Sequence, residues 1–194
     1  MMPFKSRIAE YSRQALRRLS ADSSAAAAVE FALVVPVLIA FLAVAVMAGN
    51  AYEIQRKVNM AMRTLTDLAT QQSNIGTTLA APNSAFTYSN LMAAAGLVIA
   101  PFDSSNTAMV LTGIITNAST TGTVAWSVAN SHGTALGTGA AVPVPTNLTG
   151  LTFLVQGTVT YSFAPLGVFY PTGTITLSNT IYMAPRLATV ACCI

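Results

Sequence analysis

The chain has 194 residues, which is enough for one compact domain and an additional segment. Its composition is apolar, with 53% hydrophobic and 8% charged residues, and its net charge is +3. Five basic residues precede the first long apolar run: Lys5, Arg7, Arg13, Arg17 and Arg18. After Asp67 only Asp103 and Arg186 are charged. This later part has no basic patch that could displace counterions from phosphates, which argues against nucleic-acid binding.

The uncharged run from Phe31 to Tyr52 predicts a transmembrane helix over residues 25–49. As a helix, about 22 residues extend for about 33 Å, which is close to the thickness of a bilayer core. A soluble core helix rarely stays apolar on every face over this length. Fewer basic residues follow the run than precede it, since only Arg56, Lys57 and Arg63 come soon afterwards. We therefore expect the N-terminus to be cytoplasmic and the rest to lie across the membrane.

A cleaved secretory signal peptide is the rival interpretation of this run. Ala43-Val44-Ala45 has the small-x-small form of a peptidase site, which would place the mature start near Val46. The usual hydrophobic region of a signal peptide is about 7–15 residues, and this run is longer before any good cleavage point. Retention as an anchor is the preferred interpretation.

Two residues in the run are unusual for a membrane helix. Glu30 stands at its cytoplasmic margin, where a carboxylate is costly unless it is paired or reaches water. One explanation is that a helix begins at residues 22–24 and holds Glu30 in its first turn, where a negative charge suits the helix dipole. Pro36 lacks a backbone donor and leaves the carbonyl of Ala32 free, which predicts a kink.

The pattern beyond the membrane predicts an amphipathic stalk helix over residues 50–73. Its apolar residues recur at three- and four-residue steps: Ile54, Val58, Ala61, Leu65 and Leu68. We expect this stripe to pack on the chain's own β-rich domain in preference to a partner helix. Two pairs, Glu53 with Lys57 and Arg63 with Asp67, have i,i+4 spacing. The helix is expected to end at residues 74–76.

Alternating apolar and hydroxyl residues predict strands over most of the remaining chain. The strongest patterns cover residues 152–163 and 175–183, and residues 109–116 and 123–129 are expected to form a hairpin. A short helix is predicted over residues 91–99. The fold class is therefore α+β, with a long N-terminal helix packed on an antiparallel sheet of about four strands. The exposed sheet face should carry Thr, Ser and Asn in place of charges.

Few residues could carry chemistry, and we expect no enzyme activity, cofactor, metal or small-molecule substrate. His132, the only histidine, lies in the turn-like stretch Asn130-Ser131-His132-Gly133 and is expected to be an exposed turn residue. The stretch from Asp103 to Thr107 has the Asp-x-Ser-x-Thr outline of a metal-adhesion site, but no further acidic ligand follows. No nucleophile, base and acid set is present.

The two cysteines are adjacent, at Cys192 and Cys193. In an oxidising compartment they could bond to each other or to another chain. Their spacing identifies neither partner.

The stretch from Ala25 to Pro36 resembles the TadE/TadG-like family of tight-adherence pilus assembly proteins. In that family a small residue, often Gly, is followed five places later by Glu and then by an apolar helix with a Val-Pro pair. Ala25 stands at the small position, Glu30 at the Glu position and Val35-Pro36 at the pair. Shorter matches follow at Arg56-Lys57, at Thr66-Asp67-Leu68-Ala69, at Pro101-Phe102-Asp103, at Trp126-Ser127-Val128 and at Met183-Ala184-Pro185-Arg186, so the resemblance covers most of residues 25–190.

The resemblance implies a pseudopilin-like or minor component of a type IVb (Flp) tight-adherence pilus or secretion machine in a bacterial inner membrane, serving adhesion and biofilm formation. Prepilin peptidase would cut between Ala25 and Ala26, which makes Glu30 the fifth mature residue and a candidate for pairing with the amino terminus of a neighbouring subunit. The chain departs from the family at Ala25, because Gly is favoured there, and at Ser23-Ser24, where basic residues are frequent.

The resulting organisation has four parts: a cytoplasmic basic head (1–24), a transmembrane helix (25–49), a stalk helix (50–73) and a periplasmic or surface-exposed β-rich domain (74–194). Its expected partners are the membrane, other pilus subunits through the transmembrane and stalk helices, and prepilin peptidase. The alternative function is a membrane-tethered extracytoplasmic binding or adhesion module unrelated to a filament.

Overall fold

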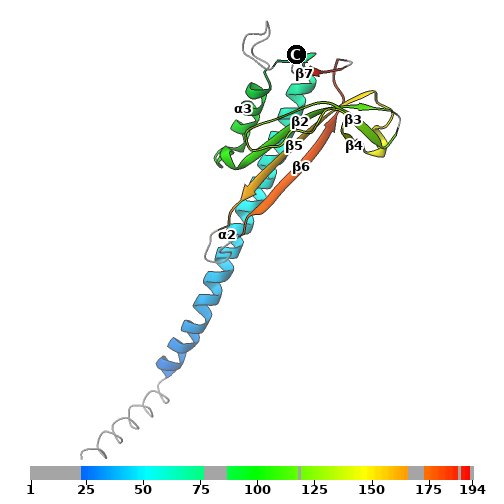
Figure 1. The fold of residues 1–194 in the computed structure, drawn as a ribbon. Coiled ribbons are helices and arrows are strands. Elements are labelled where there is room, and N and C mark those ends of the chain that lie inside the picture. Colours follow the sequence, from blue (N-terminus) through cyan, green and yellow to red (C-terminus); the bar gives the residue numbers. More distant parts are fainter. Residues whose placement is uncertain (1–22, 77–86, 118, 166–172, 188, 193–194) are drawn as a thin grey trace, which may run out of the picture. The chain divides into compact units, whose positions relative to one another are not determined.

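The computed structural model describes residues 23–76, 87–117, 119–165, 173–187 and 189–192 (Figure 1). The chain divides into two units, residues 1–48 and 49–194, and the boundary falls inside one continuous helix, α2 (Ser23–Thr70). The first unit contributes the apolar part of that helix. The second unit holds the described strands and a second helix, α3.

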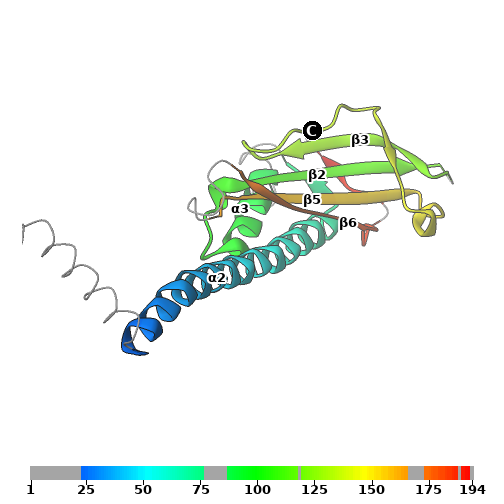
Figure 2. The ribbon, with the colours of Figure 1, turned by 90° about the horizontal axis from the view of Figure 1, so that it is seen from below.

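The second unit contains a five-stranded antiparallel sheet, which is best seen in Figure 2. Its strands are β2 (Thr107–Thr116), β3 (Thr121–Ala129), β4 (Ala141–Pro143), β5 (Phe153–Phe163) and β6 (Ile175–Met183), in the order β4-β3-β2-β5-β6. The α+β class, the predicted hairpin of β2 and β3, and the two long strands are confirmed. The predicted number of about four strands was low, because β4 has only three residues, Ala-Val-Pro, which is too short to give a strand pattern in the sequence.

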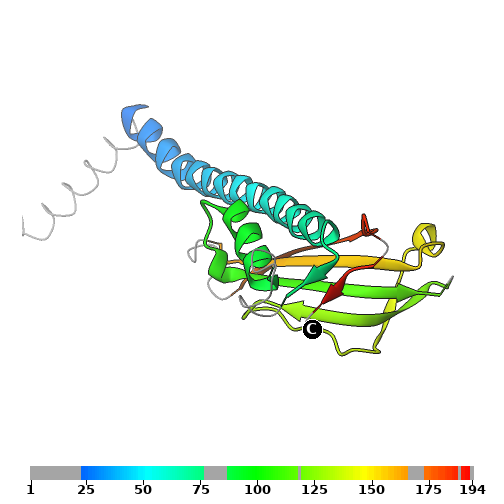
Figure 3. The same ribbon diagram turned by 90° about the horizontal axis from the view of Figure 1, so that it is seen from above.

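Helix α3 (Tyr88–Ile99) confirms the predicted short helix and starts slightly before the expected residue. Its first turn is capped by the Thr87 side chain, which accepts a hydrogen bond from the backbone N–H of Asn90 at 3.3 Å. Two single-turn 3-10 helices, η2 (Ser104–Asn106) and η3 (Thr146–Leu148), complete the helical elements of the described chain. Figure 3 shows α3 beside the C-terminal part of α2.

The main core lies between one sheet face and the two helices. It joins the stalk residues Ile54, Val58 and Leu65 to apolar side chains of α3, β2, β3 and β5, and each of these three is at most 1% exposed. The predicted stripe, including the partly buried Leu68, is confirmed as the surface that packs on the chain's own domain. A smaller core on the opposite sheet face contains Ile114, Val124, Val142, Val144 and Leu154.

Helix α2 ends at Thr70, three residues before the expected last residue, 73. The next residues leave the helix and form β1 (Asn74–Ile75), which pairs in parallel with β7 (Ala191–Cys192) near the end of the chain. In the sequence, residues 74–76 have the composition of a helix stop. Their role as a strand cannot be recognised there, because the strand with which they pair lies more than a hundred residues away. The prediction of the helix end was therefore wrong.

The open part of the outer sheet face carries paired hydroxyl groups. Thr158 contacts Thr180 at 3.0 Å, and Thr160 contacts Ser178 at 2.7 Å, each pair joining β5 to β6. No charged residue occurs in either strand. The predicted uncharged, Thr- and Ser-rich face is confirmed.

Candidate functional site

The apolar part of α2 is the first candidate surface. Within the described chain this is the helix long and apolar enough to cross a membrane, and none of the residues in its most apolar stretch is buried by the rest of the protein. Phe31, for example, is 71% exposed. A helix with large apolar side chains exposed on all faces is not a soluble core helix. It has the properties of a single-pass anchor, which it shares with a signal sequence.

Glu30 and Pro36 both lie within this helix, and the side chain of Glu30 is exposed. Because α2 already includes Ser23, Glu30 lies about two turns inside the helix. The interpretation of Glu30 as a first-turn residue that suits the helix dipole is therefore wrong. The helix runs on without interruption through Pro36. Ala25 and Ala26, on either side of the expected peptidase cut, are helical.

The stalk part of α2 approaches β5 closely at Gly157. A Cβ atom placed on Gly157 would overlap the hydroxyl of Thr66 and would lie 3.3 Å from its Cβ. The Thr66 hydroxyl cannot easily move away, because the side chain is fully buried and donates a hydrogen bond to the Met62 carbonyl at 2.8 Å. A residue without a side chain at 157 therefore allows helix and strand to meet at this point.

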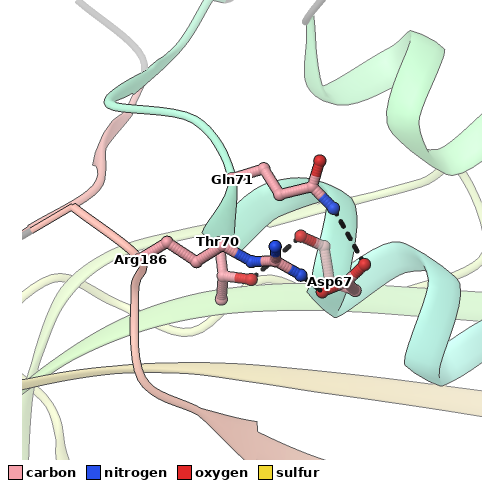
Figure 4. A network of polar contacts seen from close by, with 4 residues as sticks. All are labelled: Asp67, Thr70, Gln71 and Arg186. Carbon is pink, nitrogen blue, oxygen red and sulfur yellow. Dashed lines mark hydrogen bonds and ion pairs between the residues drawn. The ribbon is translucent and has the colours of Figure 1, made fainter.

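An ion pair clamps the end of α2 to the segment after β6 (Figure 4). A guanidinium nitrogen of Arg186 lies 2.8 Å from Asp67 Oδ1, and the Gln71 amide donates to the other carboxylate oxygen at 2.8 Å. The backbone N–H of Arg186 donates to the Thr70 carbonyl at 3.1 Å, which satisfies one of the free carbonyls at the helix end. A cation near a helix C-terminus is also favoured by the helix dipole.

This clamp corrects the predicted ion pairs of the stalk. Within the described chain Asp67 pairs with Arg186 and not with Arg63, and no salt bridge joins Glu53 to Lys57. The side chains of Arg186 and Asp67 are 64% and 45% exposed, so the clamp contributes at most about 1 kcal/mol. The clamp matters more for arrangement than for stability. It joins the short motif that contains Asp67 to the one that contains Arg186, and the family resemblance rests partly on both.

A groove of about 730 Å³ opens between α3, η2 and the turn after β3. We call it the α3 groove. Its floor includes Met92 and Met109, and its rim includes Leu97, Asp103 and His132. The predicted exposed turn is confirmed, since the N–H of Gly133 donates to the Asn130 carbonyl at 3.1 Å and His132 is exposed. The Asn130 side chain donates to the Thr107 carbonyl at 2.7 Å and accepts from the N–H of Met109 at 3.0 Å, which fixes the turn on β2.

The carboxylate of Asp103 is the acidic group of the α3 groove. It accepts hydrogen bonds from the Ser105 hydroxyl at 2.7 Å and from the Ser105 N–H at 2.8 Å. These bonds hold the pKa of Asp103 below its ordinary value, and the nearby His132 acts in the same direction. In the described chain no three His, Cys, Asp or Glu side chains gather to hold a metal ion. The Asp-x-Ser-x-Thr outline here caps η2.

The C-terminal cysteines are described only in part. Cys192 lies in β7 and is disulfide-bonded, and Cys193, the other cysteine of the chain, lies outside the described residues.

Comparison with family models, with curated proteins and with solved structures finds no match to this chain. The function is therefore argued from the residues and from the geometry described above.

Proposed function

We propose that this chain is a membrane-anchored, pseudopilin-like or minor subunit of a tight-adherence type IVb pilus machine. In this proposal its N-terminus is cytoplasmic, its folded domain lies on the other side of a bacterial inner membrane, and it acts by packing against other subunits in pilus assembly and surface adhesion. The observation that carries the proposal is the continuity of α2, because one helix contains both the apolar segment with Glu30 and the stripe that the sheet buries.

Glu30 has a specific task in this proposal. A carboxylate within an apolar helix is stabilised by an opposite charge, because Coulomb attraction is strong where the dielectric constant is low. Cleavage before Ala26 would create a free amino group four residues from Glu30, and the same group on a neighbouring subunit could pair with that carboxylate. The exposed position of Glu30 on α2 leaves it accessible to such a neighbour.

Deletion of the whole chain from the bacterium tests the role in the pilus. We expect loss of surface pili and of surface adherence, and recovery of both when the full chain is supplied in trans. Pili are counted by electron microscopy, and adherence is measured by retention of cells on a surface. Normal piliation of the deletion strain would contradict the proposal and would favour the tethered binding module, for which the α3 groove is the supporting feature.

The intact mass of the membrane-extracted protein, combined with Glu30→Gln, tests the role of Glu30. If the chain begins at Ala26, the substitution should preserve membrane insertion and reduce piliation strongly, because it removes a charge but little volume. If the chain keeps its first 25 residues, no amine forms there and the substitution should leave piliation nearly unchanged. A mature start near Val46 would contradict the anchored reading, because little of the apolar helix would remain.

A further inference from the structure

A second recess adjoins the α3 groove at Phe102, which lines both. This stalk recess has a volume of about 420 Å³ and is lined by Glu53, Arg56, Lys57, Met60, Pro101 and Phe102. Phe102 also lines the α3 groove, whose rim holds the next residue, Asp103. An anionic groove and a mainly cationic recess therefore meet at one aromatic side chain.

The charges of the two recesses are complementary. Within the described residues Asp103 is in no salt bridge, although the nearby His132 favours its charged form. Asp103 bonds only to its neighbour Ser105, and in the described residues neither Arg56 nor Lys57 has an ionic partner. Glu53 reduces the charge of the stalk recess to about one positive charge but leaves its sign. Because Asp103 accepts two hydrogen bonds that favour its charged form, it stays ionised at neutral pH.

The α3 groove is lined by the kinds of groups that bind an arginine side chain. Leu97, on its rim, is 78% exposed, and with Phe102 it offers apolar surface beside a carboxylate. An arginine stem packs on such surface while its guanidinium bonds the carboxylate in bidentate geometry, and an aromatic ring adds attraction for the cation. Arg56 is exposed on the stalk and is free to make this contact.

Two copies of the chain anchored in one membrane present these groups at the same level. Since Phe102 borders both recesses, Asp103 and Arg56 lie in adjoining parts of the surface of one folded domain. A two-fold axis between the two folded domains repeats each contact reciprocally.

We propose that a second copy of this chain binds here, with Arg56 of each copy inserted in the α3 groove of the other and paired with Asp103. The inference rests on the membrane-anchored part of the proposed function and is independent of the pilus. An anionic lipid could satisfy Arg56 and Lys57 but would leave Asp103 and the apolar rim of the groove unused, so the second copy accounts for more of the surface.

Photo-crosslinking in membranes tests the inference with the full-length chain. A photoreactive amino acid replaces Leu97, whose exposed side chain can be exchanged without disturbing the core. We expect a crosslinked dimer whose yield falls at least about tenfold with Arg56→Asp or with Asp103→Arg and recovers when both reversals are combined. The matched control is Arg63→Asp, an exposed stalk cation two turns further along α2, which should keep the full yield.

Three results would overturn the inference. They are no dimer from the otherwise wild-type chain, an equal loss with Arg63→Asp, and no recovery in the double reversal. Limited proteolysis of each variant confirms that its domain is folded, so that a lost dimer is not mistaken for unfolding. If anionic vesicles bind the chain through Arg56 while Asp103→Arg leaves the dimer yield unchanged, the site belongs to lipid and the inference fails.

The two proposals fail separately. Absence of the dimer in a strain whose pili still depend on the chain removes this inference and leaves the proposed function. If the chain forms the dimer with the expected charge dependence, but a strain from which the chain is deleted still makes pili, the proposed function fails and this inference stands.

Discussion

Gly157→Val should destabilise the folded domain by about 3 kcal/mol or more. The new side chain would occupy the space of the Thr66 hydroxyl, and overpacking of a well-filled core typically costs 1–3 kcal/mol before any buried hydrogen bond is lost. Here the Thr66 bond to the Met62 carbonyl would be strained as well. Pulse proteolysis of the membrane-inserted chain over a urea series measures the effect as a lower unfolding midpoint.

Two variants control this experiment. Gly137→Val places the same side chain where no atom lies within 4 Å, so we expect a change below about 0.5 kcal/mol. Thr66→Ala removes the hydroxyl that a new Cβ would meet, so Gly157→Ala should be less harmful in that background than in the wild type. An unchanged urea midpoint for Gly157→Val would show that α2 and β5 are further apart than described.

Trp126→Ala should be similarly damaging, with a loss of about 3–5 kcal/mol in the free energy of unfolding. The indole is only 8% exposed, and it packs over Gly113 beside Phe153. Its Nε1–H donates to the Val190 carbonyl at 2.7 Å, across 64 positions of sequence. The substitution therefore opens a cavity in the main core and releases the segment that forms β7.

Trp126→Phe separates the two contributions. It keeps much of the volume but leaves the buried Val190 carbonyl without its donor, which should cost about 1–3 kcal/mol. Hydrogen exchange is the discriminating measurement, because the N–H of Ala191, which donates to the Ser73 carbonyl at 3.0 Å, should exchange faster while β2 and β5 stay protected. Equal protection of Ala191 in the wild type and in Trp126→Phe would contradict the role of this hydrogen bond.

The elements that the sequence predicted correctly are those whose signal is local. Alternation along β5 reports which side chains face the core, and Leu177 and Ile181 of β6 are partly buried against the same core. The three- and four-residue spacing of Ile54, Val58 and Leu65 does the same for the stalk. The turn at residues 130–133 has the composition of a turn and contains His132 as an exposed residue. In each case the neighbours that decide the conformation lie within a few residues.

The features that sequence reasoning missed depend on distant partners. The helix ends at Thr70 and the following strand β1 pairs with the distant β7, while Asp67 pairs with Arg186 across 119 positions. Nothing in the sequence around Gly157 predicts that this residue lies against the Thr66 hydroxyl. The α3 groove likewise forms only when α3 and the turn after β3 meet, although the exposed Leu97 breaks the apolar spacing of α3 and could have marked an unusual surface.

The hydroxyl pairs on the outer sheet face have a consequence for the conditions under which the domain can work. Thr158 with Thr180 and Thr160 with Ser178 are neutral groups, and no titrating side chain occurs between Phe153 and Met183 except tyrosine. Dissolved ions screen interactions between charges, but they have little effect on hydrogen bonds between neutral hydroxyl groups. This face should therefore keep its structure from fresh water to seawater and from mildly acidic to mildly alkaline surroundings.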